Sequence, residues 1–267
     1  MRKIIVFILA GIILTFMTCE STTDDIGATG TLSIKTFDAP FQGDVEHIYL
    51  NIIQVSVHKS NADTSDTTSG WIILSEIDTT VDFLELVNGQ VAQLIEENLE
   101  IGQYSQLRLL LGDSSSIVIN GIQHELGVPS GSQSGVKLNL GFTIETDQIA
   151  EIYLDFDAAR SIHKHPYLER YSMKPVFKVF RSVLSATLAG TISDTLGAGL
   201  DDIVVHAVMA GDTTSTLSSD TGQYKFILLE GTYNVSAEGF ELTADTSYQD
   251  VLVTAGNSLA DYNFILN

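Results

Sequence analysis

The sequence has little cysteine, proline and tryptophan, and few basic residues. Its 267 residues include one Cys, four Pro and one Trp. A single cysteine, Cys19, excludes an intrachain disulfide, and a chain of this length can bury a sizeable core without one. Only 13 Lys and Arg stand against 34 Asp and Glu, which gives a net charge of −21. Because affinity for nucleic acid comes from neutralising phosphates with Lys and Arg, this balance argues against a nucleic-acid partner.

Long apolar runs are also scarce, except at the N-terminus. Met1-Arg2-Lys3 is basic and is followed by an almost wholly apolar stretch from Ile4 to Phe16. This order is typical of a secretory signal, and the run is shorter than the roughly 20 residues that span a membrane. Cys19 follows directly, and its placement resembles the lipobox of bacterial lipoproteins. We therefore expect residues 1–18 to be a lipoprotein signal peptide and Cys19 to carry the lipid.

That resemblance implies a membrane partner reached through an N-terminal lipid anchor, in the cell envelope and at the outer membrane. The alternative is an ordinary signal peptide with an incidental cysteine, because Phe16 and Thr18 stand where the lipobox has Leu and a small residue. Residues 19–28 are polar, acidic and without periodicity, so we expect a flexible tether there.

Alternation of apolar and polar residues with period two dominates the rest of the chain, as in Ile152, Leu154 and Phe156. A phase switch near Ile53-Gln54 predicts a β-bulge, and Asn120-Gly121 between two apolar runs predicts a tight hairpin. Val91 to Leu99 has apolar residues at helical spacing and predicts a short helix. The fold class expected is all-β, with two β-sandwich-like domains in tandem and at most one or two short helices.

Charge divides the chain into three parts. Residues 20–159 hold 4 basic and 22 acidic residues, residues 160–181 hold six basic residues and one acid, and residues 182–267 hold one basic residue and 11 acids. We place the domain boundary just past the basic segment, with one domain over residues 29–182 and a second over 185–267. The basic segment is expected to neutralise its two acidic neighbours, and docking of an acidic polymer is the alternative.

Two resemblances to known families follow from spaced motifs. Residues 29–181 resemble a bacterial lipoprotein domain, domain-of-unknown-function family 4382. The match is carried by Asp38-Ala39-Pro40, Trp71, Asp82 to Leu86 with Asn88-Gly89, Gly102 to Leu109, Leu154 to Ser161, and Met173 to Val176. The family has no established activity, so the resemblance implies architecture and location only.

Residues 185–267 resemble the carboxypeptidase regulatory-like domain, a small sandwich of transthyretin type. The residues that carry this likeness include Gly190 to Ser193, Asp220 to Tyr224, and Leu229 to Tyr233. The resemblance implies a spacer or stabilising module without catalytic residues.

Asp155 and Asp157 are two residues apart and therefore share one face of a strand. Such a pair can bind Ca²⁺ or a carbohydrate, or act in acid–base catalysis. The simpler interpretation is a solvent-facing pair of acids held by Arg160. His163 and His165 are interpreted as an incidental pair in a basic loop, so no metal site is expected.

Arg108 is a single charge within the apolar run Gln106 to Leu111. A buried arginine needs an acidic partner, so we expect an ion pair with Asp38, Asp155 or Asp157. Recognition of an anion by Arg108 is the alternative.

No catalytic or phosphate-binding signature occurs: there is no G-x-S-x-G, no P-loop and no G-x-G-x-x-G. We therefore expect a non-enzymatic binding or assembly module that carries a C-terminal spacer. The candidate binding residues are Asp38, Arg108, Asp155, Asp157 and Arg160, the expected partners are a glycan or an envelope protein, and the only cofactor considered is Ca²⁺. The alternative is a carbohydrate-active hydrolase that uses paired Asp carboxylates.

Overall fold

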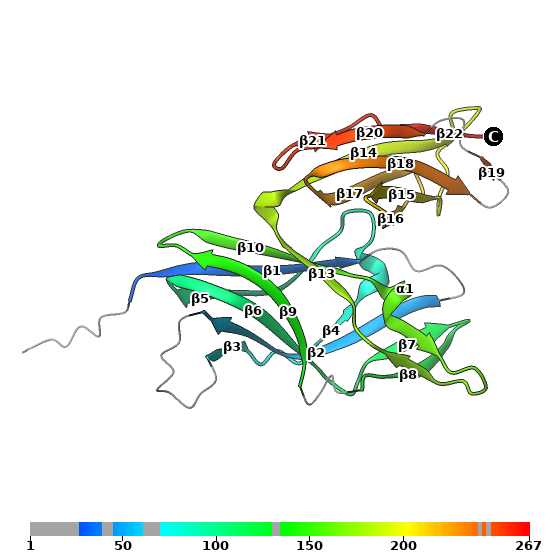
Figure 1. Ribbon diagram of the computed structural model, residues 1–267. Coiled ribbons are helices and arrows are strands. Elements are labelled where there is room, and N and C mark those ends of the chain that lie inside the picture. Colours follow the sequence, from blue (N-terminus) through cyan, green and yellow to red (C-terminus); the bar gives the residue numbers. More distant parts are fainter. Residues whose placement is uncertain (1–26, 39–44, 61–69, 130–133, 240–241, 244–246) are drawn as a thin grey trace, which may run out of the picture.

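The computed structural model describes residues 27–38, 45–60, 70–129, 134–239, 242–243 and 247–267 (Figure 1). The expected signal peptide, Cys19 and most of the tether lie outside these residues. Among the described residues, no helix has both the length and the apolar character needed to cross a membrane.

The first half of the chain forms two sheets that enclose one core. The smaller sheet has the strand order β13-β10-β1-β5. Its strands are β1 (Thr29–Asp38), β5 (Ala92–Glu100), β10 (Ile149–Phe156) and β13 (Phe177–Arg181). Its two central strands, β1 and β10, are parallel, and the outer pairings are antiparallel.

The larger sheet has nine strands in the order β11-β12-β8-β7-β2-β6-β9, with β3 and β4 also paired to β2. The longest strand is β2 (Val45–Lys59), whose first part pairs with β7 and β4 and whose second part pairs with β6 and β3. The remaining strands are β3 (Trp71–Ser75), β4 (Thr79–Asp82), β6 (Gly102–Leu111), β7 (Ser116–Ile119), β8 (Ile122–Gly127), β9 (Val136–Ile144), β11 (Ile162–Lys164) and β12 (Tyr171–Met173). Two single-turn helical segments join this half, namely the 3₁₀ helix η1 (Phe83–Leu86) and the α-helix α1 (Ala158–Ser161).

Strand alternation builds the core between these two sheets. On β6, Leu107, Leu109 and Leu111 are fully buried, whereas Arg108 and Leu110 between them are only half-buried. On β10, Ile152, Leu154 and Phe156 are buried in the same core. We call this half, residues 29–181, the N-terminal sandwich.

The second half, after the short 3₁₀ helix η2 (Ser182–Leu184), forms a second sandwich with its own core. One sheet joins β17 (Gln223–Leu229), β14 (Ser185–Asp194), β21 (Ser258–Leu259) and β22 (Phe264–Leu266). The other joins β16 (Asp212–Leu217), β15 (Val204–Met209), β18 (Gly231–Gly239), β19 (Leu242–Thr243) and β20 (Tyr248–Val253). We call residues 185–267 the C-terminal sandwich. The all-β, sandwich-like fold class is confirmed.

The helix predicted over Val91 to Leu99 is wrong, because this segment is strand β5. Leu94 and Ile95 are both buried although they are neighbours, and Leu99 follows at a helix-like spacing. The cause is a bulge at this point in the pairing of β5 with β1, where the register shifts between Ile34 and Lys35. A bulge places two successive side chains on one face, which imitates helical periodicity in the sequence.

Two other local predictions are confirmed. The register of β2 with β6 shifts between Ile52 and Gln54, which is the predicted bulge. Asn120 and Gly121 have φ angles of 49° and 72° and connect β7 to β8 in a two-residue hairpin. Positive φ at both positions is what a type I′ turn requires.

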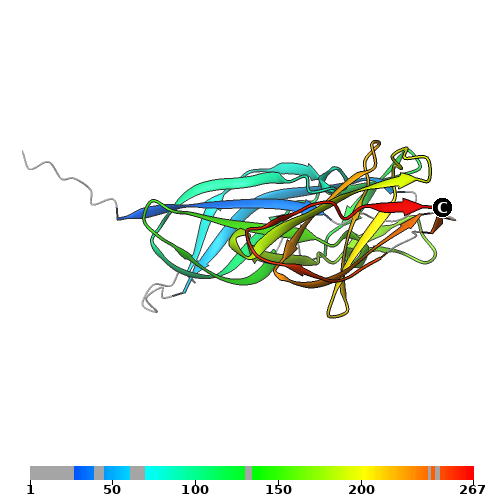
Figure 2. The ribbon, with the colours of Figure 1, turned by 90° about the horizontal axis from the view of Figure 1, so that it is seen from above.

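The C-terminal sandwich lies over the four-stranded sheet of the N-terminal sandwich (Figure 1), and the view from above shows the two stacked along their length (Figure 2). Beneath it, Phe37, Tyr153 and Phe180 form an aromatic cluster with ring centroids 5.9–6.1 Å apart. Phe37 and Phe180 are buried on the face of their sheet that points away from the N-terminal core. The two sandwiches therefore share an apolar seam.

Candidate functional site

Asp155 lies in this seam. Its carboxyl is 6% exposed and lines a small cavity of about 50 Å³, whose other walls include Lys178 and Phe180 below and Tyr233 above. Lys178 is the direct cross-strand neighbour of Asp155 on β13. Burial raises the pKa of Asp155 to about 7, while the charge of Lys178 opposes this effect. The interpretation of Asp155 as a solvent-facing acid is wrong, because the second sandwich covers this strand face.

Asp157 stands just after β10 and caps the N-terminus of α1. Its side chain accepts a hydrogen bond from the backbone N of Arg160 at 2.9 Å, and the Arg160 Nε lies 3.4 Å from its other oxygen. The predicted pairing of Arg160 with this acid is therefore present. An aspartate at this position satisfies a backbone N–H that would otherwise lack a partner.

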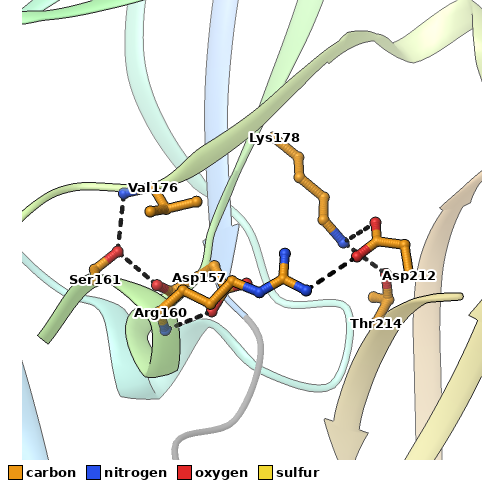
Figure 3. Close-up of polar contacts among 7 residues, drawn as sticks. All are labelled: Asp157, Arg160, Ser161, Val176, Lys178, Asp212 and Thr214. Atoms are coloured by element: carbon orange, nitrogen blue, oxygen red, sulfur yellow. Dashed lines mark hydrogen bonds and ion pairs between the residues drawn. The ribbon is translucent and has the colours of Figure 1, made fainter.

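Across the seam, both cations meet Asp212 of β16. Lys178 Nζ is 2.8 Å from one carboxylate oxygen, and Arg160 NH2 is 3.4 Å from the other (Figure 3). Lys178 also donates to Thr214 Oγ1 at 3.4 Å. The hydrogen bond from Lys178 is the main reason that the pKa of Asp212 is lowered. Two cations of the basic segment thus neutralise one acid of the C-terminal sandwich, Asp212.

A second contact across the seam is made by the turn after η1. The backbone N of Asn88 donates to Thr216 Oγ1 at 2.9 Å, and the Asn88 side chain donates to the carbonyl of Gln223 at 3.1 Å. Gly89 has φ of 70° and lies against the aliphatic stem of Lys225, where a Cβ would approach within 2.9 Å of that stem. The turn therefore requires glycine both for its φ angle and for this close approach.

The structure brings four of the five predicted binding residues to one end of the β1–β10 pair. Asp38 ends β1 opposite Phe156 in the backbone register, next to Asp155, Asp157 and Arg160. Lys178 and Asp212, which complete the cluster, were not singled out by the sequence analysis. Lys178 could have been noticed as part of the basic segment, whereas no local signal marks Asp212.

The fifth residue, Arg108, is elsewhere. The ion-pair partners predicted for it are Asp38, Asp155 and Asp157; the pairs with Asp155 and Asp157 are not formed, and the side chain of Asp38 lies outside the part of the chain that the structure describes. Arg108 is half-buried on the outer face of the larger sheet, where Nε donates to Ser56 Oγ at 3.1 Å. Its guanidinium carbon lies 4.3 Å from the centre of the Trp71 ring. Period-two alternation turns Arg108 away from the core that holds Leu107 and Leu109, so the arginine needs no buried acid.

Around Arg108 the larger sheet presents a cation-rich patch. Arg108 is the direct cross-strand neighbour of Lys137 on β9, whose Nζ lies 5.9 Å from the same indole ring. The described residues place no acid in an ion pair with either cation. We define the cationic patch as Ser56, His58, Trp71, Arg108 and Lys137. The amide pair Gln106–Asn139 adjoins it at 2.8 Å.

A cavity of about 620 Å³ is at the other end of the larger sheet. It opens between β8 and the β11–β12 hairpin and is lined by polar and aromatic residues, including His124, His165, Arg170 and Tyr171. The rings of His124 and Tyr171 lie 5.1 Å apart, and the Lys164 ammonium lies 5.6 Å from the Tyr171 ring. Sequence analysis missed this site because its walls are far apart in the chain.

Metal ligands do not gather in the part of the chain that the structure describes. No group of three or more His, Cys, Asp or Glu side chains there could hold a metal ion. His163 and His165 belong to the β11–β12 hairpin, where the backbone N of Tyr167 donates to His165 Nδ1 at 3.3 Å.

Comparison with known proteins identifies one family. The family described as a domain of unknown function, DUF4382, matches residues 29–175. Comparison with curated proteins finds no match.

Several solved structures share a distant likeness. The Bacillus anthracis TIE protein is 13% identical, with 90% of this chain and 34% of that protein covered and a TM-score of 0.27. The shaft pilin spaA of Lactobacillus rhamnosus GG is 9% identical, with 90% and 96% covered and a TM-score of 0.24. A major pilin of Streptococcus pyogenes is 10% identical, with 90% and 98% covered and a TM-score of 0.20. The chain thus spans about a third of the length of the Bacillus anthracis protein, and at these TM-scores none of the likenesses indicates a function.

Proposed function

The chain belongs to the DUF4382 family, whose match spans more than half of its length, and from that premise we propose that it is a non-enzymatic binding module of the cell envelope. Its ligand is an acidic glycan, bound at the cationic patch. The C-terminal sandwich acts as a spacer fixed to the N-terminal sandwich through the seam.

The observation that carries this proposal is a pair of cations on the larger sheet that no described acid neutralises. Arg108 and Lys137 are direct cross-strand neighbours, and like charges in that position repel each other. In a chain with 34 acids, no described acid lies in an ion pair with either of them. A guanidinium has five donors, and Arg108 commits one of them to Ser56. A carboxylate on a ligand would relieve the repulsion and engage the remaining donors.

The aromatic and amide groups of the patch favour a glycan over a compact anion. Trp71 lies beside His58 with ring centroids 5.3 Å apart, and the amides of Gln106 and Asn139 extend the same face along the strands. Planar aromatic rings and amide groups contact the faces and hydroxyls of sugar rings, while the two cations supply the preference for uronic acids. The proposal thus gives Arg108 the role that the sequence offered as an alternative, which is recognition of an anion.

The position of the predicted carboxylates supports a non-enzymatic role. A glycoside hydrolase needs two carboxyls that face one substrate cleft about 5–10 Å apart. Asp157 caps α1 and contacts Arg160, and Asp155 lies under the C-terminal sandwich beside a cavity of about 50 Å³. That space fits water, and is too small for a sugar ring. The hydrolase alternative therefore has no supporting observation at these acids.

Because Trp71 is the only tryptophan, its fluorescence reports on the patch. We expect an oligogalacturonate to change the Trp71 emission saturably in the full chain in detergent, with an affinity that falls as salt rises. A neutral oligosaccharide of equal length should have little effect. Arg108→Ala and Lys137→Ala should each weaken binding about tenfold, which corresponds to ~1.4 kcal/mol. Lys174→Ala, which removes an exposed cation outside the patch, is the matched control.

Equal responses to the acidic and neutral oligosaccharides, or no response to either, would refute glycan recognition by charge. The same titration repeated with and without Ca²⁺ tests whether the ion participates. A Ca²⁺ requirement would point to ligands outside the described residues, since no metal cluster is present among them.

The location is part of the proposal. The signal-like residues 1–18 and the lone Cys19 support a lipid anchor, expected at the outer membrane. Cys19→Ala should release the protein into the soluble fraction, and intact mass should show acyl chains on Cys19 of the natural protein. A free thiol at Cys19, or cleavage at another site, would contradict the anchor. We also propose that residues 185–267 are a carboxypeptidase regulatory-like domain, supported by their separate sandwich and core.

A further inference from the structure

The spacious cavity at the end of the larger sheet is a fork between two β-hairpins. Strand β8 pairs with β7 along Ile122–Glu125 but with β12 only through Leu126 and Gly127. Beyond that junction the β11–β12 hairpin diverges from β8. The chain reverses direction at the tip of this hairpin, where His165 N donates to Arg170 O. The labelled hairpin β7–β8 is at the lower right of Figure 1. The cavity of about 620 Å³ occupies the opening of this fork.

One wall of the fork is an open strand edge. The two-residue hairpin aligns Ile119 with Ile122 and Ile117 with His124, and Leu126 N donates to Ser115 O on the β7 side. Backbone N–H groups alternate in direction along a strand, so those of Gln123 and Glu125 face the fork. No described strand pairs with β8 at these two positions. Such an edge can accept another extended chain.

The tips of both hairpins carry exposed apolar side chains. Ile122 is 60% exposed at the start of β8, and Tyr167 and Leu168 at the opposite tip are 89% and 51% exposed. Large apolar residues with this exposure, grouped around a cavity, are typical of an interaction surface. A small anion would leave them uncovered.

The charge inside the fork favours an acidic side chain at one position, beside Arg170, because Glu125 of β8 lines the same cavity and would repel an acid placed next to it. Glu169 is engaged by Lys164 at 3.1 Å and by the hydroxyl of Tyr171 at 3.2 Å. The adjacent Arg170 lines the cavity and forms no ion pair with a described residue. His124 and His165 line the cavity with it.

We propose that the fork binds an extended segment of a partner protein, which carries an acidic side chain and adds to the edge of β8 as a further strand. The backbone of the segment pairs with Gln123 and Glu125. Its apolar side chains cover Ile122, Tyr167 and Leu168, and an acidic side chain meets Arg170. Strand addition derives affinity from main-chain hydrogen bonds and specificity from alternate side chains.

The test is selection of a phage-displayed library of twelve-residue peptides on the full chain, followed by measurement of the enriched peptides by fluorescence anisotropy. We expect enriched sequences that alternate polar and apolar residues, with an acid at one position. Gln123→Pro removes the outward N–H and should weaken binding at least tenfold. It keeps the backbone pairing with β7 and removes one side-chain contact with that strand, the hydrogen bond from Gln123 Nε2 to Ser116 Oγ. Arg170→Glu should weaken acidic peptides by a similar factor, and it covers the case in which the proline disturbs folding.

Lys174→Ala is the matched control and should leave peptide binding unchanged. Neither fork variant should alter the Trp71 response to oligogalacturonate, because the cationic patch contacts the second half of β2 and the fork joins its first half through β7. No enriched peptides, or peptides that bind Gln123→Pro and Arg170→Glu as tightly as the natural chain, would overturn the proposal. Competition of the peptides by a neutral oligosaccharide at the fork would overturn it in favour of a glycan site.

Discussion

The seam and the cationic patch both present cations on the outer face of a sheet in the N-terminal sandwich, yet they differ in what they meet. At the seam, Lys178 and Arg160 reach Asp212 of the other sandwich. At the patch, Arg108 and Lys137 meet the face of Trp71 and no described acid. Of the acids expected to form a binding site, Asp155 is buried in the seam and Asp157 holds Arg160, whereas the arginine expected to stabilise the fold has no described acid as a partner.

This difference shows that the role of a polar side chain on an outer sheet face depends on whether a second domain buries that face. Asp155 sits on a strand whose outer face would be exposed in the N-terminal sandwich alone, and its pKa is raised because a second sandwich covers it. Arg108 has no such cover, since the larger sheet faces away from the C-terminal sandwich (Figure 1). Substitutions at the seam should therefore change stability, and substitutions at the patch should change binding.

The largest effect is expected for Phe180→Ala at the seam. The ring is buried and packs against Phe37 and Tyr153, so its removal leaves a cavity between the sandwiches. We expect the free energy of unfolding to fall by about 3–5 kcal/mol, measured by urea denaturation with Trp71 fluorescence. Leu252→Ala, at a position 67% exposed, is the control and should have little effect. A loss below ~1 kcal/mol for Phe180→Ala would mean that the seam contributes little to folding.

Asp155→Asn should have the next largest effect, and its sign depends on pH. The folded chain keeps the proton up to about pH 7, whereas the unfolded chain releases it near 3.8. The stability that this bound proton contributes is therefore fully present below pH 3.8 and is lost as the pH rises toward 7. The variant should lack this loss and exceed the natural chain by on the order of 4 kcal/mol at pH 8.

Parallel stability profiles of Asp155→Asn and the natural chain between pH 4 and pH 8 would contradict the burial of this carboxyl. The groups that face Asp155 are Lys178 on β13, Asp157 after β10 and Asp212 on β16. The variant Asp157→Asn removes one of these charges, that of the acid nearest in sequence, and so shows how much that charge contributes to the raised pKa of Asp155.

Asp212→Asn should cost about 1 kcal/mol or less, because the ion pairs it breaks are partly solvated. The loss should shrink in 1 M salt, which screens the same contacts. A loss that is unchanged by salt would show that Asp212 acts through packing. Thermal denaturation at two salt concentrations makes this measurement.

The smallest stability effect is expected for Arg108→Ala. A half-exposed cation over an aromatic ring contributes about 0.5–1 kcal/mol, so the denaturant midpoint should barely move. This is opposite to the large loss that a buried ion pair with Asp38, Asp155 or Asp157 would give. A decrease of more than ~3 kcal/mol in the free energy of unfolding would show that Arg108 has a structural role, and would remove it from the proposed glycan site.

The sequence predicts features that local residues determine. Asn120-Gly121 specifies a hairpin because positive φ angles favour those two residues, and the phase switch at Ile53-Gln54 reveals a bulge within one strand. The bulge beside Leu94 misled the same reasoning, because it exists only in the pairing with β1. The environment of Asp155 depends on Asp212 and Tyr233, which come from a separate sandwich. No pattern near Asp155 contains that information, and the fork likewise joins segments distant in the chain.

The pairing of β1 has a mechanical consequence under the proposed N-terminal anchor. β1 is the first described strand, and it lies between β10, which runs parallel to it, and β5, which runs antiparallel. A pull directed along β1 from the anchor would load the hydrogen bonds on both of its sides at once, in shear, instead of opening them one after another. Chain tension would thus be transmitted into the N-terminal sandwich as a whole.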